Sequence, residues 1–188
     1  MGQCGDGSSF VHPRETAELR VVTAERDDLG RYVDLLEELA DWLESRGIKQ
    51  WPRGRVNLSS MYFAGSITRR EVQLAFIGDQ LVGTLRLLMS DPIVWPEFKH
   101  DDAVYVYNLG VRRTWAGQDL GGRLLDWAEC RAAGLKRLFV RLDCQHDNAF
   151  LRGYYERKGF IPRGEVDADY PHPVGRERLC RFEKAVHT

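Results

Sequence analysis

The sequence predicts a single mixed α/β domain, and three observations support this fold class. The 188 residues correspond to one domain, or one domain with a tail, at roughly 150 residues per domain. Hydrophobic residues make up 43% and charged residues 29% of the chain, which is ordinary usage for a protein with one well-buried core. The hydrophobic period also changes along the chain between 3.6 and 2 residues, so helices and strands are interspersed.

The N-terminal segment shows no hydrophobic period. Residues 1–17 are rich in Gly and Ser and are expected to form a flexible arm, so the domain is predicted to cover residues 18–186. Residues 19–23 predict a short strand. Thr23 is expected to cap the amphipathic helix that follows, whose apolar positions recur at helical spacing until Gly47 ends the run.

The middle of the chain predicts one weaker helix and then strands. Residues 58–67 have helical spacing, after which residues 72–87 alternate on both sides of Gly78-Asp79, a typical hairpin turn. Residues 103–111 are rich in β-branched and aromatic side chains, which favour a strand. We expect this strand to be central in the sheet.

The last third of the chain predicts a β-α-β unit, another helix and two final strands. Together with the earlier elements, the order is β-α-α-β-β-β-α-β-α-β-β, which gives a mixed central sheet flanked by helices. Residues 178–184 alternate apolar and charged side chains like an exposed or shared edge strand, which leaves a homodimer open. The expected ranges are 117–134 and 148–158 for the helices and 138–142, 160–166 and 178–184 for the strands.

Charge, hydropathy and cysteine usage exclude several classes of protein. Lys and Arg number 27 and Asp and Glu number 28, so the net charge is −1 and no overall field favours nucleic acid or an anionic membrane. No apolar run approaches the roughly 20 residues that span a bilayer. Cys4, Cys130, Cys144 and Cys180 form no Cys-x-x-Cys pair, and His146 adds too few ligands for a metal site. The sequence therefore predicts a cytoplasmic protein with reduced thiols and no metal.

A glycine-bearing loop links the predicted central strand directly to the next helix. The segment from Val111 to Leu125 reads Val-Arg-Arg-Thr-Trp-Ala-Gly-Gln-Asp-Leu-Gly-Gly-Arg-Leu-Leu. A helix N-terminus offers free N–H donors and partial positive charge, and glycines let a phosphate approach the backbone closely. By composition alone, a phosphate cradle and a simple tight turn are about equally favoured.

A second motif makes the assignment specific. Asn148, Tyr155, Gly159 and Phe160 have the spacing Asn-x6-Tyr-x3-Gly-Phe at a strand-to-helix junction. Together with the upstream strand, loop and helix, this pattern resembles the GNAT N-acetyltransferase superfamily over nearly the whole domain. The resemblance implies a GNAT-like fold with splayed central strands. It also implies transfer of an acetyl group from acetyl-CoA to a primary amine by direct attack in a ternary complex.

The resemblance also implies where the cofactor binds. Backbone groups of Leu109, Gly110 and Val111 would take the pantetheine arm and the thioester carbonyl, with the Leu109 amide as oxyanion donor. Two loop positions depart from the family pattern, because Ala116 replaces a long polar residue and Asp119 replaces a glycine, which brings a negative charge close to the phosphates. The pyrophosphate cradle falls on Ala116, Gly117, Gln118, Asp119, Leu120, Gly121 and Gly122.

The same resemblance assigns roles to the second motif. Asn148 would bond the pantetheine chain or a bound water, and Tyr155 would donate a proton to the departing thiolate, since a phenol with a pKa near ~10 is protonated at neutral pH. Tyr154 is expected to be a packing residue. No general base is assigned; Asp102 and Asp143 are candidates, although each is more simply a capping or solvated acid.

The acceptor stays open at this stage. The first hypothesis is a small-molecule amine, and the second is a protein N-terminus or lysine. A third hypothesis is a catalytically weak acyl-CoA-binding or interaction module, which the charge of Asp119 and the unassigned base would favour. Aromatic residues such as Trp42, Trp51 and Trp95 could shape an acceptor pocket, although most aromatic side chains are expected in the core.

Overall fold

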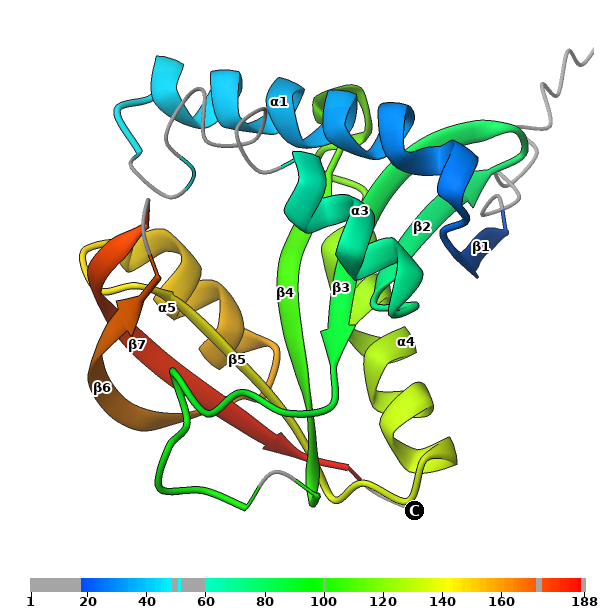
Figure 1. Cartoon of the computed structure of the whole chain (residues 1–188). Helices are drawn as coiled ribbons and strands as arrows, with labels where there is room; N and C mark the ends of the chain where they lie inside the picture. The colour runs from blue at the N-terminus through cyan, green and yellow to red at the C-terminus, as the bar shows by residue number, and fades with distance from the viewer. Residues whose placement is uncertain (1–17, 49–50, 52–59, 100, 172–173, 187–188) are drawn as a thin grey trace, which may run out of the picture.

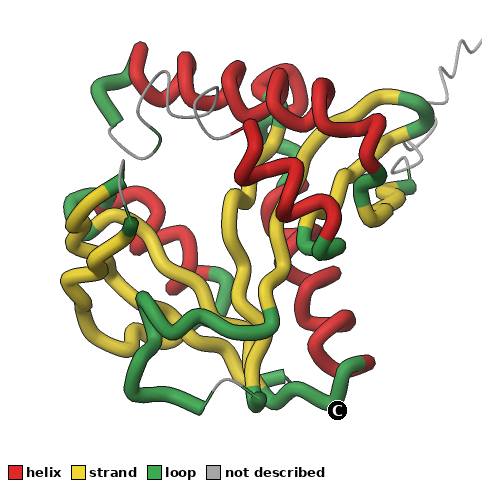
Figure 2. Tube along the Cα trace, viewed as in Figure 1, coloured by secondary structure: helices red, strands yellow, loops and turns green. Residues whose placement is uncertain are grey.

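The structure is a computed structural model that describes residues 18–48, 51, 60–99, 101–171 and 174–186. It contains seven strands in one mixed sheet (Figures 1 and 2). The predicted single mixed α/β domain is confirmed, whereas the expected N-terminal arm lies outside the described residues. The strands are β1 Leu19–Thr23, β2 Val72–Ile77, β3 Gln80–Leu88, β4 Ala103–Val111, β5 Phe139–Gln145, β6 Ile161–Tyr170 and β7 Gly175–Ala185.

Four α-helices are present in the described part of the chain, together with two short 3-10 turns. Among these residues, no helix combines the length and the apolar character that crossing a membrane requires. The helices are α1 Leu29–Ser45, α3 Ser60–Thr68, α4 Leu120–Gly134 and α5 Ala149–Arg157, and the turns are η1 Arg26–Asp28 and η2 Arg113–Trp115.

The beginning of α1 differs from the prediction. Thr23 is not a helix cap but the last residue of β1, where its hydroxyl donates to the Gln73 side chain at 3.0 Å. The capping box lies two residues further on and begins η1, because the Glu25 amide donates to the Asp28 carboxylate at 2.7 Å. Helix α1 follows directly, with Asp28 as its N-cap residue and no side-chain capping hydrogen bond. Pairing of Thr23 with Gln73 on β2 extends the strand through this position.

The start of α4 is also later than expected, at Leu120 instead of residue 117. Gly117 has a φ of +81° and Asp119 a φ of +53°, so two positions of the loop lie in the left-handed region and cannot continue a right-handed helix. This backbone conformation turns the chain sharply from η2 into the helix.

The helices cover both faces of the sheet. On one face, α4 and α5 bury a core that includes Leu124, Leu142 and Phe182. On the other face, α1 and α3 pack over β2 with Tyr32, and the long connection between β3 and β4 covers the rest with Trp95. The site lies between the end of α1 on the second face and α5 on the first, beside the loop that leads into α4.

The strand order is β1-β2-β3-β4-β5-β7-β6, with β4 and β5 in parallel and every other neighbouring pair antiparallel. Strand β7 pairs with β5 on one side and with β6 on the other. The interpretation of residues 178–184 as an edge strand is therefore wrong, because β6 is the edge. The argument for a homodimer through that strand loses its basis.

The parallel pairing of β4 and β5 is short. It runs from Ala103 opposite Phe139 to Val106 opposite Leu142, and the two strands separate beyond that point. The expected splayed central strands are thus present, and the strands form a fork that opens toward α5 and the end of α1 (Figure 1).

Candidate active site

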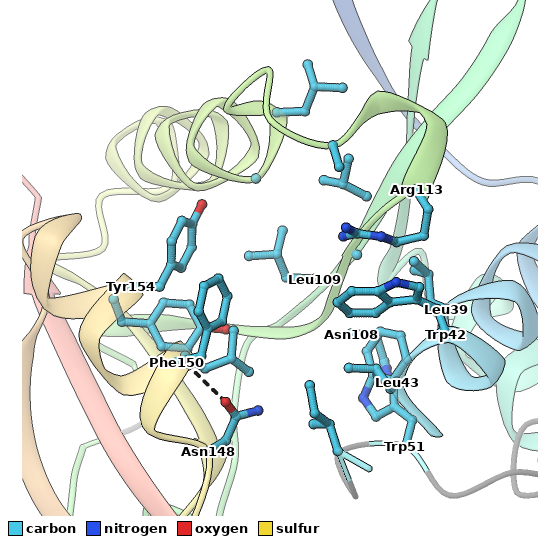
Figure 3. Close-up of a pocket in the computed structure, with 18 of the residues that line it drawn as sticks. Leu39, Trp42, Leu43, Trp51, Asn108, Leu109, Arg113, Asn148, Phe150 and Tyr154 are labelled. Carbon is cyan, nitrogen blue, oxygen red and sulfur yellow. Dashed lines mark hydrogen bonds between the residues drawn. The ribbon is translucent and has the colours of Figure 1, made fainter. Parts of the chain in front are cut away.

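A cavity of about 940 Å³ fills the fork between β4 and β5 (Figure 3). The end of α1 forms one wall, α5 forms the opposite wall, and the loop before α4 forms a third. The second half of β4 runs along the cavity with its backbone unpaired on the β5 side. The cavity is large enough for the arm of a cofactor together with a second small molecule.

The separation of β4 from β5 follows from a bulge in β4. Asn108 has a φ of +47°, a left-handed conformation that Asn tolerates better than most residues, and the register with β3 shifts at this point. Arg86, which is 2% exposed, donates to the Asn108 side chain at 3.4 Å and to the Tyr62 hydroxyl at 3.0 Å. Glu71 accepts from the other terminal nitrogen of Arg86 at 2.8 Å. The buried arginine thus holds the bulge in place.

Sequence reasoning did not find this arginine. Its signal is a charged residue between apolar positions in the middle of a strand, which is unusual for a buried face. The bulge places the backbone of Leu109, Gly110 and Val111 along the cavity. A Cβ on Gly110 would collide with the end of the Leu39 side chain of α1, so a larger residue here would require that side chain to move.

The loop before α4 lies at the opposite end of the cavity. Five of its predicted cofactor-binding residues line the cavity, and Gln118 and Gly122 are not among the lining residues. The amides in the first turn of α4 have no partner within the helix, so this end carries donors and partial positive charge. The five lining residues are Ala116, Gly117, Asp119, Leu120 and Gly121.

The carboxylate of Asp119 is neutralised by a neighbour that the sequence did not indicate. The Lys158 ammonium at the end of α5 lies 2.7 Å from Asp119 Oδ2. A Cβ on Gly122 would collide with that ammonium and would lie 2.6 Å from Asp119 Oδ1, so Gly122 leaves room for the ion pair. The charge of Asp119 therefore does not face the cavity alone.

Tyr155 lies on the wall that α5 forms. It is 6% exposed, and its ring packs 5.7 Å from Phe182 and 6.1 Å from Phe160 between ring centroids. Burial first, and then the neighbouring Cys144 and Asp143, raise the pKa of Tyr155 well above its ordinary value. The phenol thus keeps its proton at neutral pH and still reaches the cavity.

Tyr154 packs as expected but also lines the cavity (Figure 3). A Cβ on Gly121 would lie 2.8 Å from the Tyr154 hydroxyl, so this phenol points to the start of α4. Burial raises the pKa of Tyr154 to about 12. The two adjacent tyrosines thus serve different parts of the cavity, Tyr154 the loop and Tyr155 the fork.

Asn148 is the cap of α5. Its side-chain oxygen accepts from the Leu151 amide at 3.1 Å, which Figure 3 marks with a dashed line. The side-chain nitrogen of Asn148 is directed toward the middle of the cavity in the same view. The cap thus orients the amide group and fixes where the helix with Tyr155 begins.

The structure separates the two acids that were candidates for the general base. Asp102 forms an ion pair with Arg141 at 2.9 Å and does not line the cavity. Asp143 lines the cavity at the fork. Burial, and then the like charges of Asp91 and Glu177, raise the pKa of Asp143 to about 8.

His146 lies outside the cavity and has different neighbours from those considered in the sequence. Its Nδ1 is 3.0 Å from Glu165 Oε1 and 3.7 Å from Cys180 Sγ, whereas Cys144 is not part of this group. Arg178 holds the other oxygen of Glu165 at 2.6 Å. These contacts link His146 to β6 and β7.

Comparison with known proteins places this geometry in a family. The model of the Acetyltransferase (GNAT) family matches residues 36–160. An uncharacterized N-acetyltransferase, YesJ, from Bacillus subtilis (strain 168) is 31% identical over 155 residues, which cover 80% of this chain and 86% of the relative.

Two solved structures share the fold. A GNAT family acetyltransferase from Listeria monocytogenes 4b F2365 has a TM-score of 0.74 and 24% identity, covering 89% of this chain and 94% of its own. The putative acetyltransferase yncA from Salmonella typhimurium, solved with its cofactor acetyl-CoA, has a TM-score of 0.64 and 13% identity. The matched regions are 91% of this chain and 95% of that one.

The chain is therefore an N-acetyltransferase, and acetyl-CoA fits as its co-substrate because the cavity joins an amide-rich helix start to an unpaired strand. It belongs to the GNAT acetyltransferase family.

Proposed function

We propose that the protein transfers the acetyl group of acetyl-CoA to the primary amine of a small molecule, by direct attack of the amine in a ternary complex. The observation that carries the proposal is the fork, where the unpaired backbone of β4 and the buried phenol of Tyr155 border one cavity. An amine and a thioester held together in that cavity need no covalent enzyme intermediate.

The cofactor would extend along the cavity from the loop to the fork. Its pyrophosphate would accept from the amides of residues 117–122, and its pantetheine arm would follow Leu109, Gly110 and Val111 in place of a β5 partner strand. Asn148 would bond the same arm. The Leu109 amide would donate to the thioester carbonyl and stabilise the oxyanion that forms during attack.

Tyr155 would act as the general acid. A phenol whose burial raises its pKa stays protonated at neutral pH, so it has a proton for the departing thiolate of coenzyme A. Its ring is fixed between Phe160 and Phe182, which limits the positions that its hydroxyl can occupy. The rigid ring supports a directed proton transfer.

The lining of the cavity favours a small acceptor. The wall opposite α5 carries Trp42 and Trp51, and the Arg113 guanidinium lies 3.8 Å from the centre of the Trp42 ring (Figure 3). An aromatic wall with a stacked cation offers surface to a compact apolar or aromatic amine. Trp95, by contrast, belongs to the β3–β4 connection, is fully buried in the core and takes no part in this wall.

The test is a panel of amines in a thiol-release assay, with acetyl-CoA binding measured separately by isothermal titration. The proposal expects turnover with small amines and little with peptides that offer an N-terminus or a lysine. Turnover with peptides alone would replace the small-molecule acceptor by a protein acceptor. Tight acetyl-CoA binding without turnover on any amine would favour a binding module instead.

A further inference from the structure

Asp143 lies where the parallel strands β4 and β5 separate. The last paired residues of the parallel strands are Val106 and Leu142, so Asp143 is the first residue of β5 beyond the ladder. Side chains alternate along a strand, and Asp143 therefore lies on the same face as Phe139 and Arg141. These residues face the core under the β3–β4 connection, opposite the face that α4 and α5 cover.

Among the described residues, the charged groups that shift the pKa of Asp143 are both acidic. Like charges reach it from Asp91 in the β3–β4 connection and from Glu177 on β7, and these are the two charges that act on its pKa. Asp91 already accepts from the Tyr107 hydroxyl at 2.5 Å. The remaining titratable groups whose pKa values respond to Asp143 are Tyr107 on β4, Tyr170 on β6, Cys144 beside it and Tyr155 on α5.

The surroundings leave the Asp143 carboxylate ready to accept a proton. Among the described residues, no hydrogen bond contributes to the pKa of Asp143. Asp102 differs, because it forms an ion pair with Arg141. Burial and like charges both disfavour the ionised form of Asp143, so it binds a proton more tightly than an ordinary carboxylate does. The ionised carboxylate is therefore a stronger base than an ordinary carboxylate, and it becomes available above a pKa of about 8.

We propose that Asp143 is the general base of the reaction and accepts the proton of the acceptor amine as its nitrogen attacks the thioester. The inference rests on the function proposed above and adds a catalytic residue to it. Because Asp143 and Tyr155 lie on opposite faces of the sheet at the same fork, the amine would lose its proton on one side of the fork and the thiolate would gain one on the other.

The proton balance closes with these two residues. The neutral amine nitrogen forms a bond to the acetyl carbon, and the bond from that carbon to the sulfur breaks. The nitrogen loses one proton to Asp143, and the thiolate gains one from Tyr155. Water then takes the proton from Asp143 and returns one to Tyr155, so the products are the amide and free coenzyme A.

The experiment compares Asp143→Asn with the wild-type chain, using the least basic amine that the wild-type chain accepts. Such an amine stays neutral over the range studied, so that the pH profile of kcat/KM reports the enzyme. The wild-type profile should rise to a plateau above an apparent pKa of about 8. Asp143→Asn should lower kcat by about 10²-fold or more and remove this rise. Unchanged acetyl-CoA affinity and a melting temperature no lower than that of the wild-type chain would show that the variant is folded.

Glu177→Gln is the matched control. It removes one of the like charges without touching the fork, so kcat should persist and the midpoint of the profile should move to lower pH. Full activity of Asp143→Asn with an unchanged midpoint of the pH profile would refute the role of Asp143 as the base and leave the proposed function intact. A wild-type chain that binds acetyl-CoA and acetylates no amine would overturn the proposed function together with the base.

Discussion

The ion pair between Asp119 and Lys158 sets the charge beside the loop that we propose for the pyrophosphate. With 2.7 Å between their charged atoms, the pair presents almost no net charge to an anion. Replacing Asp119 by Asn keeps the shape of the side chain and tolerates a φ of +53°, but it leaves the ammonium of Lys158 unopposed. Acetyl-CoA should therefore bind more tightly to Asp119→Asn.

The size of the effect follows from Coulomb's law. Two unit charges roughly 6 Å apart in water interact by about 0.7 kcal/mol, so an ammonium near the roughly two charges of a pyrophosphate gains about 1.4 kcal/mol before screening. That energy is about tenfold in affinity, and physiological salt reduces it, so we expect a gain of about 3- to 10-fold. The change should cost little stability, because the Asp119 side chain makes no capping hydrogen bond and an exposed pair contributes roughly 0.2–1 kcal/mol.

The assay is isothermal titration of acetyl-CoA at low and at high salt. Lys158→Met should weaken binding by a similar factor, and the double variant should return close to the wild-type affinity. High salt should shrink both single effects. Unchanged affinity in both single variants, or weaker binding of Asp119→Asn, would refute the placement of the pyrophosphate on this loop.

Three further predictions concern the fork and the sheet. Tyr155→Phe should lower kcat by about 10²-fold or more with nearly unchanged acetyl-CoA affinity, whereas Tyr154→Phe should keep its turnover; equal losses in both would remove the acid role. Since the folded-state pKa of Asp143 is about 8 against 3.8 ordinarily, the folded chain binds its proton more tightly, so the free energy of unfolding falls as pH rises between these values. Asp143→Asn should therefore gain stability relative to the wild-type chain as pH increases, and denaturant titrations showing a constant difference would contradict this. Gly83→Ala should lower stability by about 1–3 kcal/mol, because its Cβ would lie 2.8 Å from the backbone oxygen of Gly110; an unchanged melting temperature would contradict that clash.

Local patterns in the sequence were sufficient for most of the fold. The hairpin at Gly78-Asp79 and the strand Ala103–Val111 appear where alternation and turn chemistry predict them. Both signals depend on residues close together in the chain, which is why sequence reasoning reads them well. The prediction that Thr23 caps a helix is wrong, because pairing with Gln73, 50 residues away, places Thr23 in a strand.

The candidate site was predictable only where a family motif or a glycine loop marked it. Leu109, Gly121 and Tyr155 line the cavity, while their roles toward the cofactor stay predictions. The partner of Asp119 was not predictable, because Lys158 follows it by 39 residues and belongs to a different helix. Likewise, the surroundings of Asp143 depend on strands that the chain order does not bring together.

The short parallel ladder between β4 and β5 makes the sheet two cooperative units joined by a narrow neck. Long antiparallel ladders hold β1 to β4 together on one side and β5 to β7 on the other, whereas the neck consists of four residue pairs. Helix α4 packs against β3, β4 and β5 on one face of the neck, and the core around Trp95 covers the other. Opening fluctuations should therefore concentrate beyond the ladder, where a cofactor bound in the fork would add the contacts that the ladder lacks. The co-substrate would then tie the two units together, and its departure after each turnover would loosen the molecule.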